Sequence, residues 1–220
     1  MAPYNEGLRR YRDGDLNGAL TDFTQAIEFD PGAADAYYNR GVVRQDLGDL
    51  AGARADYDEA LKINPRLVMA LLHRGIVRED QGDRPGAVAD YDTALEIDPK
   101  NTRALFNRGV VRRELGDLAG ALADLDAALQ IDPRHAAAYT ARGLVREDEG
   151  DFRHALEDYG EALKLDPDLA DAYLNRGLVL IVLAKDAEAQ KDFDEYLKRM
   201  PDQKPHLDEL VREAKKKRKP

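Results

Sequence analysis

Residues 35–65 read DAYYNRGVVRQDLGDLAGARADYDEALKINP, and this stretch decides the fold. Apolar side chains recur every three or four residues on both sides of Gly48-Asp49, as they do on two amphipathic helices. A glycine followed by Asp is typical of a turn that leads into a helix, because the Asp side chain caps free backbone N–H groups. The second helix ends at Asn64-Pro65, since proline disfavours helical angles in the residue before it. The stretch therefore predicts helices over 36–47 and 51–63 and no strands.

The same pattern recurs along the chain with a period of 34 residues. A fixed period of this length is the signature of stacked helical repeats, in which each repeat covers its neighbour. The sequence predicts six repeats, over residues 1–33, 34–67, 68–101, 102–135, 136–169 and 170–201. The prolines that mark the period are Pro31, Pro65, Pro99, Pro133, Pro167 and Pro201.

When Gly41 is counted as position 8, the second repeat has Tyr37 at position 4, Ala53 at position 20, Tyr57 at position 24 and Pro65 at position 32. This pattern resembles the tetratricopeptide repeat (TPR) family. The resemblance implies an all-α fold, a right-handed superhelical solenoid of antiparallel helix pairs whose first helices line a concave, peptide-binding surface. The chain departs from the family pattern because it has no Trp and carries Arg at positions 7 and 11.

The periodicity continues for half a repeat beyond the sixth proline. Leu207, Leu210, Val211 and Ala214 take the apolar positions of a further first helix. The last repeat of a solenoid has no neighbour, so an amphipathic helix at this place shields an apolar face. We therefore predict a C-terminal capping helix over 202–214 that covers the apolar run 178–183, followed by a basic tail over 215–220.

Charge and hydropathy limit the partners and the location. The formal net charge is −10 and the mean hydropathy is −0.60, which leaves no apolar run long enough to span a bilayer. The N-terminus lacks the pattern of a secretory signal, so a cytoplasmic location is the default expectation. Binding of a polyanion requires Lys and Arg to neutralise phosphates, and this chain is acidic. We expect no membrane span and no nucleic-acid partner.

Catalytic and metal-binding motifs are missing from the sequence. There is no Cys and no Ser, and the four His residues fall in different repeats. Thiol nucleophiles, serine triads and pairs of His at metal-ligand spacing are therefore excluded. We expect a non-enzymatic protein with no catalytic residues, no cofactor and no metal.

The arginines at positions 7 and 11 could form an anion-binding ladder, but the helical phase favours a structural role. Positions 4, 7 and 11 point toward the second helix of the repeat. Position 23, on that second helix, is Asp in every repeat. We predict an Arg–Asp ion pair between the two helices of each repeat, for example between Arg108 and Asp124.

The candidate binding residues lie on the opposite side of the first helices. Positions 5 and 9 are mostly apolar, position 6 is mostly Asn, and positions 12 and 13 carry several acids. An apolar floor beside amides and carboxylates fits an amphipathic peptide or helix that carries basic residues. The predicted peptide-binding groove comprises Tyr38, Asn39, Val42, Asp46, Leu72, His73, Ile76, Glu79, Asp80, Phe106, Asn107, Val110, Glu114, Leu144, Asp148 and Asn175.

Two other interpretations of this surface stay open. Its acids can be an ordinary solvated face, with position 9 packing only on neighbouring first helices. Alternatively the protein is structural and forms homo-oligomers or filaments, because a repeat end or the basic tail binds another copy. The resemblance also implies a clamp of Lys and Asn for acidic C-terminal tails in related chaperone adaptors, and Tyr38 and Val42 stand where that clamp would be.

Overall fold

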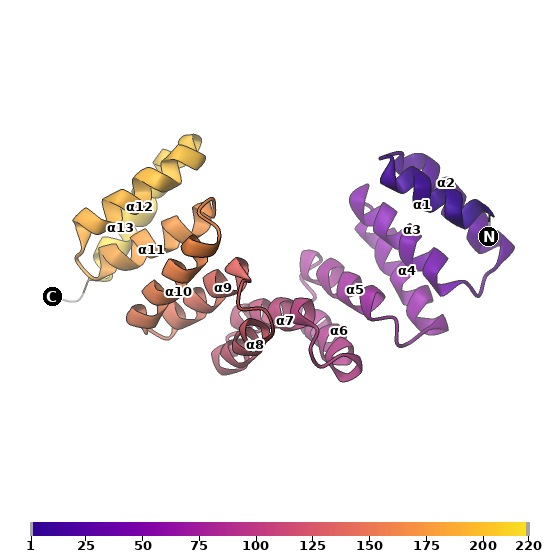
Figure 1. Cartoon of the computed structure of the whole chain (residues 1–220), viewed down its shortest axis with the longest axis horizontal. Helices are drawn as coiled ribbons and strands as arrows, with labels where there is room; N and C mark the ends of the chain where they lie inside the picture. The colour runs from indigo at the N-terminus through magenta and orange to yellow at the C-terminus, as the bar shows by residue number, and fades with distance from the viewer. Residues whose placement is uncertain (1, 219–220) are drawn as a thin grey trace. The chain divides into compact units, whose positions relative to one another are not determined.

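The computed structural model describes residues 2–218, and these residues contain helices and no strand (Figure 1). The chain divides into two compact units, Met1–Val111 and Arg112–Pro220. Met1 and the last two residues of the predicted basic tail lie outside the described residues. The α-helices are α1 (Ala2–Arg12), α2 (Leu16–Phe29), α3 (Ala34–Asp46), α4 (Leu50–Ile63), α5 (Val68–Asp80), α6 (Arg84–Ile97), α7 (Thr102–Glu114), α8 (Leu118–Ile131), α9 (Ala136–Asp148), α10 (Phe152–Leu165), α11 (Ala170–Val182), α12 (Asp186–Arg199) and α13 (Lys204–Lys216).

The predicted all-α class and the pairing of consecutive helices are confirmed. Within the N-terminal unit α1 packs on α2, α3 on α4 and α5 on α6, and within the C-terminal unit α9 packs on α10 and α11 on α12. The helices predicted over 36–47 and 51–63 are α3 and α4, and α3 begins two residues earlier, at Ala34. Asp35 lies in that first turn, where an acidic side chain interacts favourably with the helix dipole.

A glycine and an aspartate shape the turn inside each of the first five repeats. Gly48 has φ +80°, a left-handed conformation that glycine adopts without strain, and Asp49 accepts the N–H of Gly52 at 2.9 Å. In the sixth repeat the left-handed residue is Ala184, with φ 59°, and Lys185 provides no side-chain cap. A non-glycine residue in this region costs about 1 kcal/mol or more, so this turn is the least favourable of the six.

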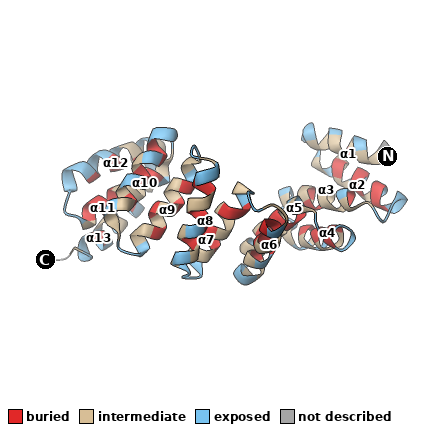
Figure 2. Cartoon of the chain, turned by 60° about the horizontal axis from the view of Figure 1, so that its bottom comes forward, coloured by how far each residue is buried: buried red, intermediate tan, exposed pale blue. Residues whose placement is uncertain are grey.

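The core of each unit is built from small residues packed against aromatic rings. Buried residues recur along the helices of both units (Figure 2). Ala53 and Tyr57 of α4 are fully buried. A Cβ atom at Gly41 would lie 2.6 Å from Cε1 of Tyr57, so glycine at position 8 allows this ring to touch the backbone of the first helix. The same close approach joins Gly75 to Tyr91 and Gly143 to Tyr159.

Ion pairs connect the two helices of each pair. Asp56, buried on α4, accepts hydrogen bonds from Nε and Nη2 of Arg40 at 3.0 and 2.7 Å, and its second oxygen lies 2.9 Å from Nη1 of Arg44. The predicted interhelix pair is confirmed here and in three other repeats. Arg108 and Asp124 belong to different units, and their pairing stays a prediction. The other confirmed pairs are Arg74–Asp90, Arg142–Asp158 and Arg176–Asp192.

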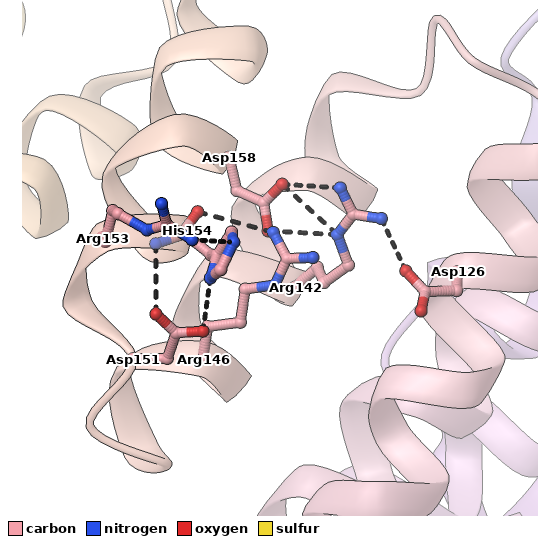
Figure 3. A network of polar contacts seen from close by, with 7 residues as sticks. All are labelled: Asp126, Arg142, Arg146, Asp151, Arg153, His154 and Asp158. Atoms are coloured by element: carbon pink, nitrogen blue, oxygen red, sulfur yellow. Dashed lines mark hydrogen bonds and ion pairs between the residues drawn. The ribbon is translucent and has the colours of Figure 1, made fainter.

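The position-7 arginines also reach the preceding repeat, which the sequence did not predict. Nη1 of Arg142 lies 2.5 Å from Asp126 of α8, while Nε and Nη2 of the same side chain bind Asp158 of α10 (Figure 3). Neighbouring repeats are therefore linked by charge as well as by apolar packing. Equivalent links join Arg74 to Asp58 and Arg108 to Asp92.

The last helix covers the sixth repeat. Leu207 and Ala214 of α13 are buried in a cluster with Ile181 of α11 and Phe193 of α12. The capping helix was predicted over 202–214, whereas α13 runs from Lys204 to Lys216 after a 3-10 turn at Pro201–Gln203. Part of the predicted basic tail is therefore helical. Arg218 continues from this helix and donates to the carbonyl oxygen of Ile181 at 2.7 Å.

Candidate peptide-binding face

Most of the predicted groove residues lie on the first helices of the N-terminal unit, on α3, α5 and α7. α3 contacts both α1 and α5, so α1, α3 and α5 are neighbouring first helices. The apolar and amide side chains are partly exposed, and the carboxylates of Asp46 and Asp80 are exposed. We call this set the first-helix face: Tyr38, Asn39, Val42, Asp46, His73, Ile76, Glu79, Asp80, Phe106, Asn107 and Val110.

Leu72 does not belong to this face. Its side chain is 1% exposed, so it packs in the interior of the N-terminal unit and offers no surface to a partner. The prediction placed Leu72 beside Tyr38 because both occupy position 5 of their repeats. Tyr38 is partly exposed at this position, and the smaller leucine lies within the protein.

Aromatic side chains join α3 to α5 at the centre of the first-helix face. The rings of Tyr38 and His73 meet edge to face with centroids 5.6 Å apart, and the buried ring of Tyr57 lies 5.9 Å from His73. Gln45 Oε1 accepts the Tyr57 hydroxyl at 2.8 Å and lies 3.3 Å from Nδ1 of His73. Because Gln45 Oε1 is an acceptor, this contact places the proton of a neutral His73 on Nδ1.

His73 should make stability depend on pH. Burial, together with the positive charge of Arg103, lowers the pKa of His73 to about 4. The unfolded chain takes up this proton near pH 6.5, so between about pH 6.5 and 4 it binds more protons than the folded state, and stability falls as the pH falls. Because the ring is partly exposed, we expect this loss to amount to about 1–2 kcal/mol.

Urea denaturation of the wild type and of His73→Gln at several pH values measures this contribution. The difference in unfolding free energy between the two proteins should change across the window from about pH 6.5 to 4, with the wild type losing more. Parallel pH profiles would show that His73 is not held neutral. All other titrating groups are common to both proteins and cancel in the difference.

The amides of position 6 are partly engaged within the protein. Asn39 Nδ2 donates to the hydroxyl of Tyr4 at 3.0 Å and to the carbonyl oxygen of Asp35 at 2.7 Å. A hydrogen bond also connects Asn107 with Tyr91. Since both N–H groups of Asn39 have acceptors, this side chain can offer a partner its oxygen, which accepts from a peptide N–H group.

The predicted acidic side of the groove consists of two different kinds of carboxylate. The position-12 acids Glu79 and Glu147 are partly buried and accept the hydroxyls of Tyr91 and Tyr159. Burial raises the pKa of Glu147. These two carboxylates therefore serve mainly as hydrogen-bond acceptors for buried tyrosines. The position-13 acids are exposed and are the ones that a partner can meet.

The exposed position-13 carboxylates differ in their own contacts. Asp46 accepts the hydroxyl of Tyr11 at 2.7 Å, and this bond raises the pKa of Tyr11 to about 12. Asp148 lies 2.6 Å from Nε of Arg113, so its charge is partly balanced. The sequence reading overlooked Tyr11, Gln45 and Arg113 on the first helices. The spacing of twelve residues between Gln45 and Tyr57, which recurs at Glu79–Tyr91 and Glu147–Tyr159, could have indicated the role of Gln45. Tyr11 and Arg113 instead bind acids that lie 35 residues later in the sequence.

The remaining predicted residues belong to the C-terminal unit. Leu144 of α9 is partly buried against Tyr159 and Val179, as expected for a position-9 side chain that packs on the next repeat. Asn175 of α11 is partly exposed, and Glu114 and Asp148 are exposed. α9 and α11 contact each other, so Leu144, Asp148 and Asn175 lie on neighbouring first helices.

Neither a membrane helix nor a metal site emerges from the described part of the chain. None of its helices is both long enough and apolar enough to cross a bilayer. Over the same residues, 2–218, no group of His, Asp and Glu side chains is arranged to hold a metal ion.

Comparison with known families identifies the fold. Tetratricopeptide repeat profiles match residues 34–67 and 72–136, and a TPR repeat profile matches residues 7–48 and 147–181. The chain belongs to the tetratricopeptide repeat family. Its members form protein–protein interaction scaffolds, and the resemblance found in the sequence is thereby confirmed. No curated protein matches this TPR chain significantly.

Solved TPR structures resemble the chain over most of its length. YrrB, described as a TPR protein with an unusual peptide-binding site, is 26% identical with a TM-score of 0.69, over 88% of this chain and 97% of YrrB. MamA is 26% identical with a TM-score of 0.67, over 74% of this chain and 95% of MamA. PilW, a type IV pilus biogenesis factor, shares the fold at 20% identity with a TM-score of 0.81, over 91% of this chain and 93% of PilW.

Proposed function

We propose that this TPR protein is a non-enzymatic, cytoplasmic scaffold whose first-helix face binds a basic amphipathic peptide or helix of a partner protein. The observation that carries the proposal is the juxtaposition on α3 and α5 of partly exposed apolar side chains, such as Val42 and Ile76, with the exposed carboxylates Asp46 and Asp80. Apolar contacts hold such a ligand, whereas the carboxylates attract its Lys and Arg residues.

Three further observations support this proposal. The chain carries a net charge of −10, which favours encounter with basic partners and disfavours acidic ones. None of the described residues donates to the side-chain oxygen of Asn39, so this oxygen can accept a hydrogen bond from a peptide backbone. YrrB, with which the chain shares its fold over most of both lengths, is itself described as having a peptide-binding site.

Titration with a designed peptide tests the proposal. The probe is a synthetic amphipathic helix with one Leu face and one Lys face, and its twin with Glu in place of Lys is the control ligand. Phe106→Ala should weaken binding by about 1–3 kcal/mol at both low and high salt, if the ring is an anchor. Asp80→Asn should weaken binding chiefly at low salt, because salt screens exposed charges.

Glu96→Gln is the matched control for the loss of one charge, because Glu96 is exposed on the second helix α6. This variant should bind the Lys peptide like the wild type. Equal binding by the wild type, Phe106→Ala and Asp80→Asn would place the binding surface elsewhere. Preference for the Glu twin would contradict the basic character of the ligand.

A second candidate function is self-assembly into homo-oligomers. It is favoured by Phe29 at the end of α2, whose side chain is 79% exposed beside a cavity of about 590 Å³ lined by Tyr4, Ala26 and Ala33. An exposed phenyl ring next to an apolar hollow is a common element of subunit contacts. The solution mass from light scattering separates an assembling protein from a monomeric adaptor.

A further inference from the structure

The links between successive repeats follow one rule. Nη1 of the position-7 arginine binds an acceptor that lies sixteen residues earlier, at position 25 of the preceding repeat. In repeats 3, 4 and 5 this acceptor is a carboxylate, at 2.5–2.7 Å. In repeat 2 it is the hydroxyl of Thr24, 3.4 Å from Arg40. The carboxylates are Asp58, Asp92 and Asp126.

The sixth repeat breaks this rule, because residue 160 is glycine. Arg176 uses Nε and Nη2 to bind Asp192 at 2.8 and 2.6 Å. Its Nη1 has no acceptor among residues 2–218. A Cβ atom built at Gly160 would meet none of the described atoms within 4 Å, so the place of the missing side chain is open space.

A cavity lies beside this arginine. It measures about 740 Å³, and Tyr173, Arg176 and Leu180 of α11 line it together with side chains of α12. In the third repeat, Arg74 and Asp58 line a separate cavity of about 410 Å³. In the sixth repeat no carboxylate occupies the equivalent of Asp58, because that position is Gly160.

The acidic side chains that line this cavity have donors of their own. Asp192 is bound by Arg176, Asp194 accepts from Gln190 at 2.8 Å, and Glu195 is paired with Lys198. Glu188 lies 4.0 Å from Lys185. Lys191 is an additional exposed cation on the rim, and no acidic side chain of the described residues pairs with it.

Leucine at position 11 makes the site around Arg176 less polar than its equivalent in the fifth repeat. In the fifth repeat Arg146 occupies this position and shares Asp158 with Arg142. In the sixth repeat Leu180 occupies it, so one wall is apolar, and among residues 2–218 Arg176 is the one cation that binds Asp192. Arg176, whose Nη1 has no acceptor among the described residues, thus lines a cavity whose walls include Leu156, Leu180 and Tyr173.

We propose that this cavity binds a carboxylate of a partner protein, an Asp or Glu side chain flanked by apolar residues, which takes the place of the missing position-25 aspartate. Nη1 of Arg176 donates to it as Arg142 donates to Asp126, and Lys191 contributes charge from the rim. The apolar walls hold the neighbouring side chains of the ligand. This site is distinct from the first-helix face, because residues of α10, α11 and α12 line it. Its proposed ligand is acidic, whereas the ligand proposed for the first-helix face is basic.

Two substitutions at residue 160 test the proposal. Gly160→Asp supplies the carboxylate within the chain and should fill the site, whereas Gly160→Ala adds a methyl group and leaves Arg176 free. Both replace a glycine in the middle of α10 by a residue with higher helix propensity, so both variants should fold. Melting curves check this directly.

The probe is an N-acetylated Leu-Glu-Leu amide, followed by NMR through the guanidinium resonances of Arg176. Saturable shifts of these resonances are expected in the wild type and in Gly160→Ala. The affinity of Gly160→Asp for the peptide should be lower by about tenfold or more, and so should the affinity of the wild type for the Leu-Gln-Leu twin. The proposed site is overturned if Gly160→Asp binds the Leu-Glu-Leu peptide as tightly as the wild type does, or if Gly160→Ala does not bind it. Binding of inorganic phosphate in preference to the Glu peptide overturns the assignment to a carboxylate.

Discussion

Replacing Asp158 with Ala is expected to lower the free energy of unfolding by about 3–5 kcal/mol. The Asp158 side chain is 2% exposed and accepts from both Arg142 and Arg146, with contacts of 2.6–3.0 Å (Figure 3). Its removal leaves two partly buried guanidinium groups without this carboxylate, and the cost of an unpaired buried charge exceeds that of an ordinary hydrogen bond. The midpoint of urea denaturation, followed by circular dichroism, measures the loss.

Asp126→Ala is the matched control for this variant. Asp126 contacts the same Arg142 at 2.5 Å, but its side chain is 47% exposed. Exposed ion pairs contribute about 0–1 kcal/mol, so this substitution should change the midpoint little. Equal effects of the two substitutions would mean that burial does not set the strength of the network, and a neutral Asp158→Ala would refute its structural role.

Deletion of residues 204–220 should destabilise the C-terminal unit by about 4 kcal/mol and promote association. The deletion removes α13, whose Leu207 and Ala214 are buried against Ile181 and Phe193. The newly exposed apolar face of the sixth repeat then becomes a surface on which another copy can bind. Repeat proteins lose stability by the interface removed, so the other repeats should stay folded.

A shorter deletion, of residues 215–220, separates the apolar cover from the charged tail. It removes the bond from Arg218 to Ile181 and the contact of Lys215 with Asp186 at 3.9 Å, and it leaves Leu207 in place. We expect a loss of about 1 kcal/mol and no association. Light scattering and thermal melts of both deletions provide the comparison. A monomeric and fully stable protein without α13 would rule out its role as a cap.

The fold could be predicted because one short pattern recurs at a fixed period. Pro65 and the Gly48-Asp49 turn fix where helices begin and end, and the 34-residue period carries that information through the chain. The ion pair between Arg40 and Asp56 was predictable for the same reason, since both residues lie in one repeat and helical phase points them toward each other. Each repeat of such a protein contacts only its neighbours, so a sequence pattern that recurs in every repeat determines the structure of the array.

The candidate site was less predictable, because its properties depend on contacts between repeats. Position number alone did not show that Leu72 is buried while Tyr38 is partly exposed. The hydroxyl of Tyr159 engages Glu147, so this acid serves the interior although its position is that of a surface residue. Burial and hydrogen bonding of this kind follow from packing in three dimensions, which periodicity does not describe.

The carboxylate at position 25 also determines how the array can lengthen by in-frame duplication. If residues 68–101 were duplicated, Arg74 of the second copy would lie next to Asp92 of the first copy, so the new junction would reproduce the ion pair that joins Arg108 to Asp92. If residues 136–169 were duplicated, Gly160 of the first copy would precede Arg142 of the second copy, and that arginine would have no carboxylate at position 25 of the preceding repeat. Recombination can therefore extend the middle of the array with its junctions intact, whereas the C-terminal end resists the same change.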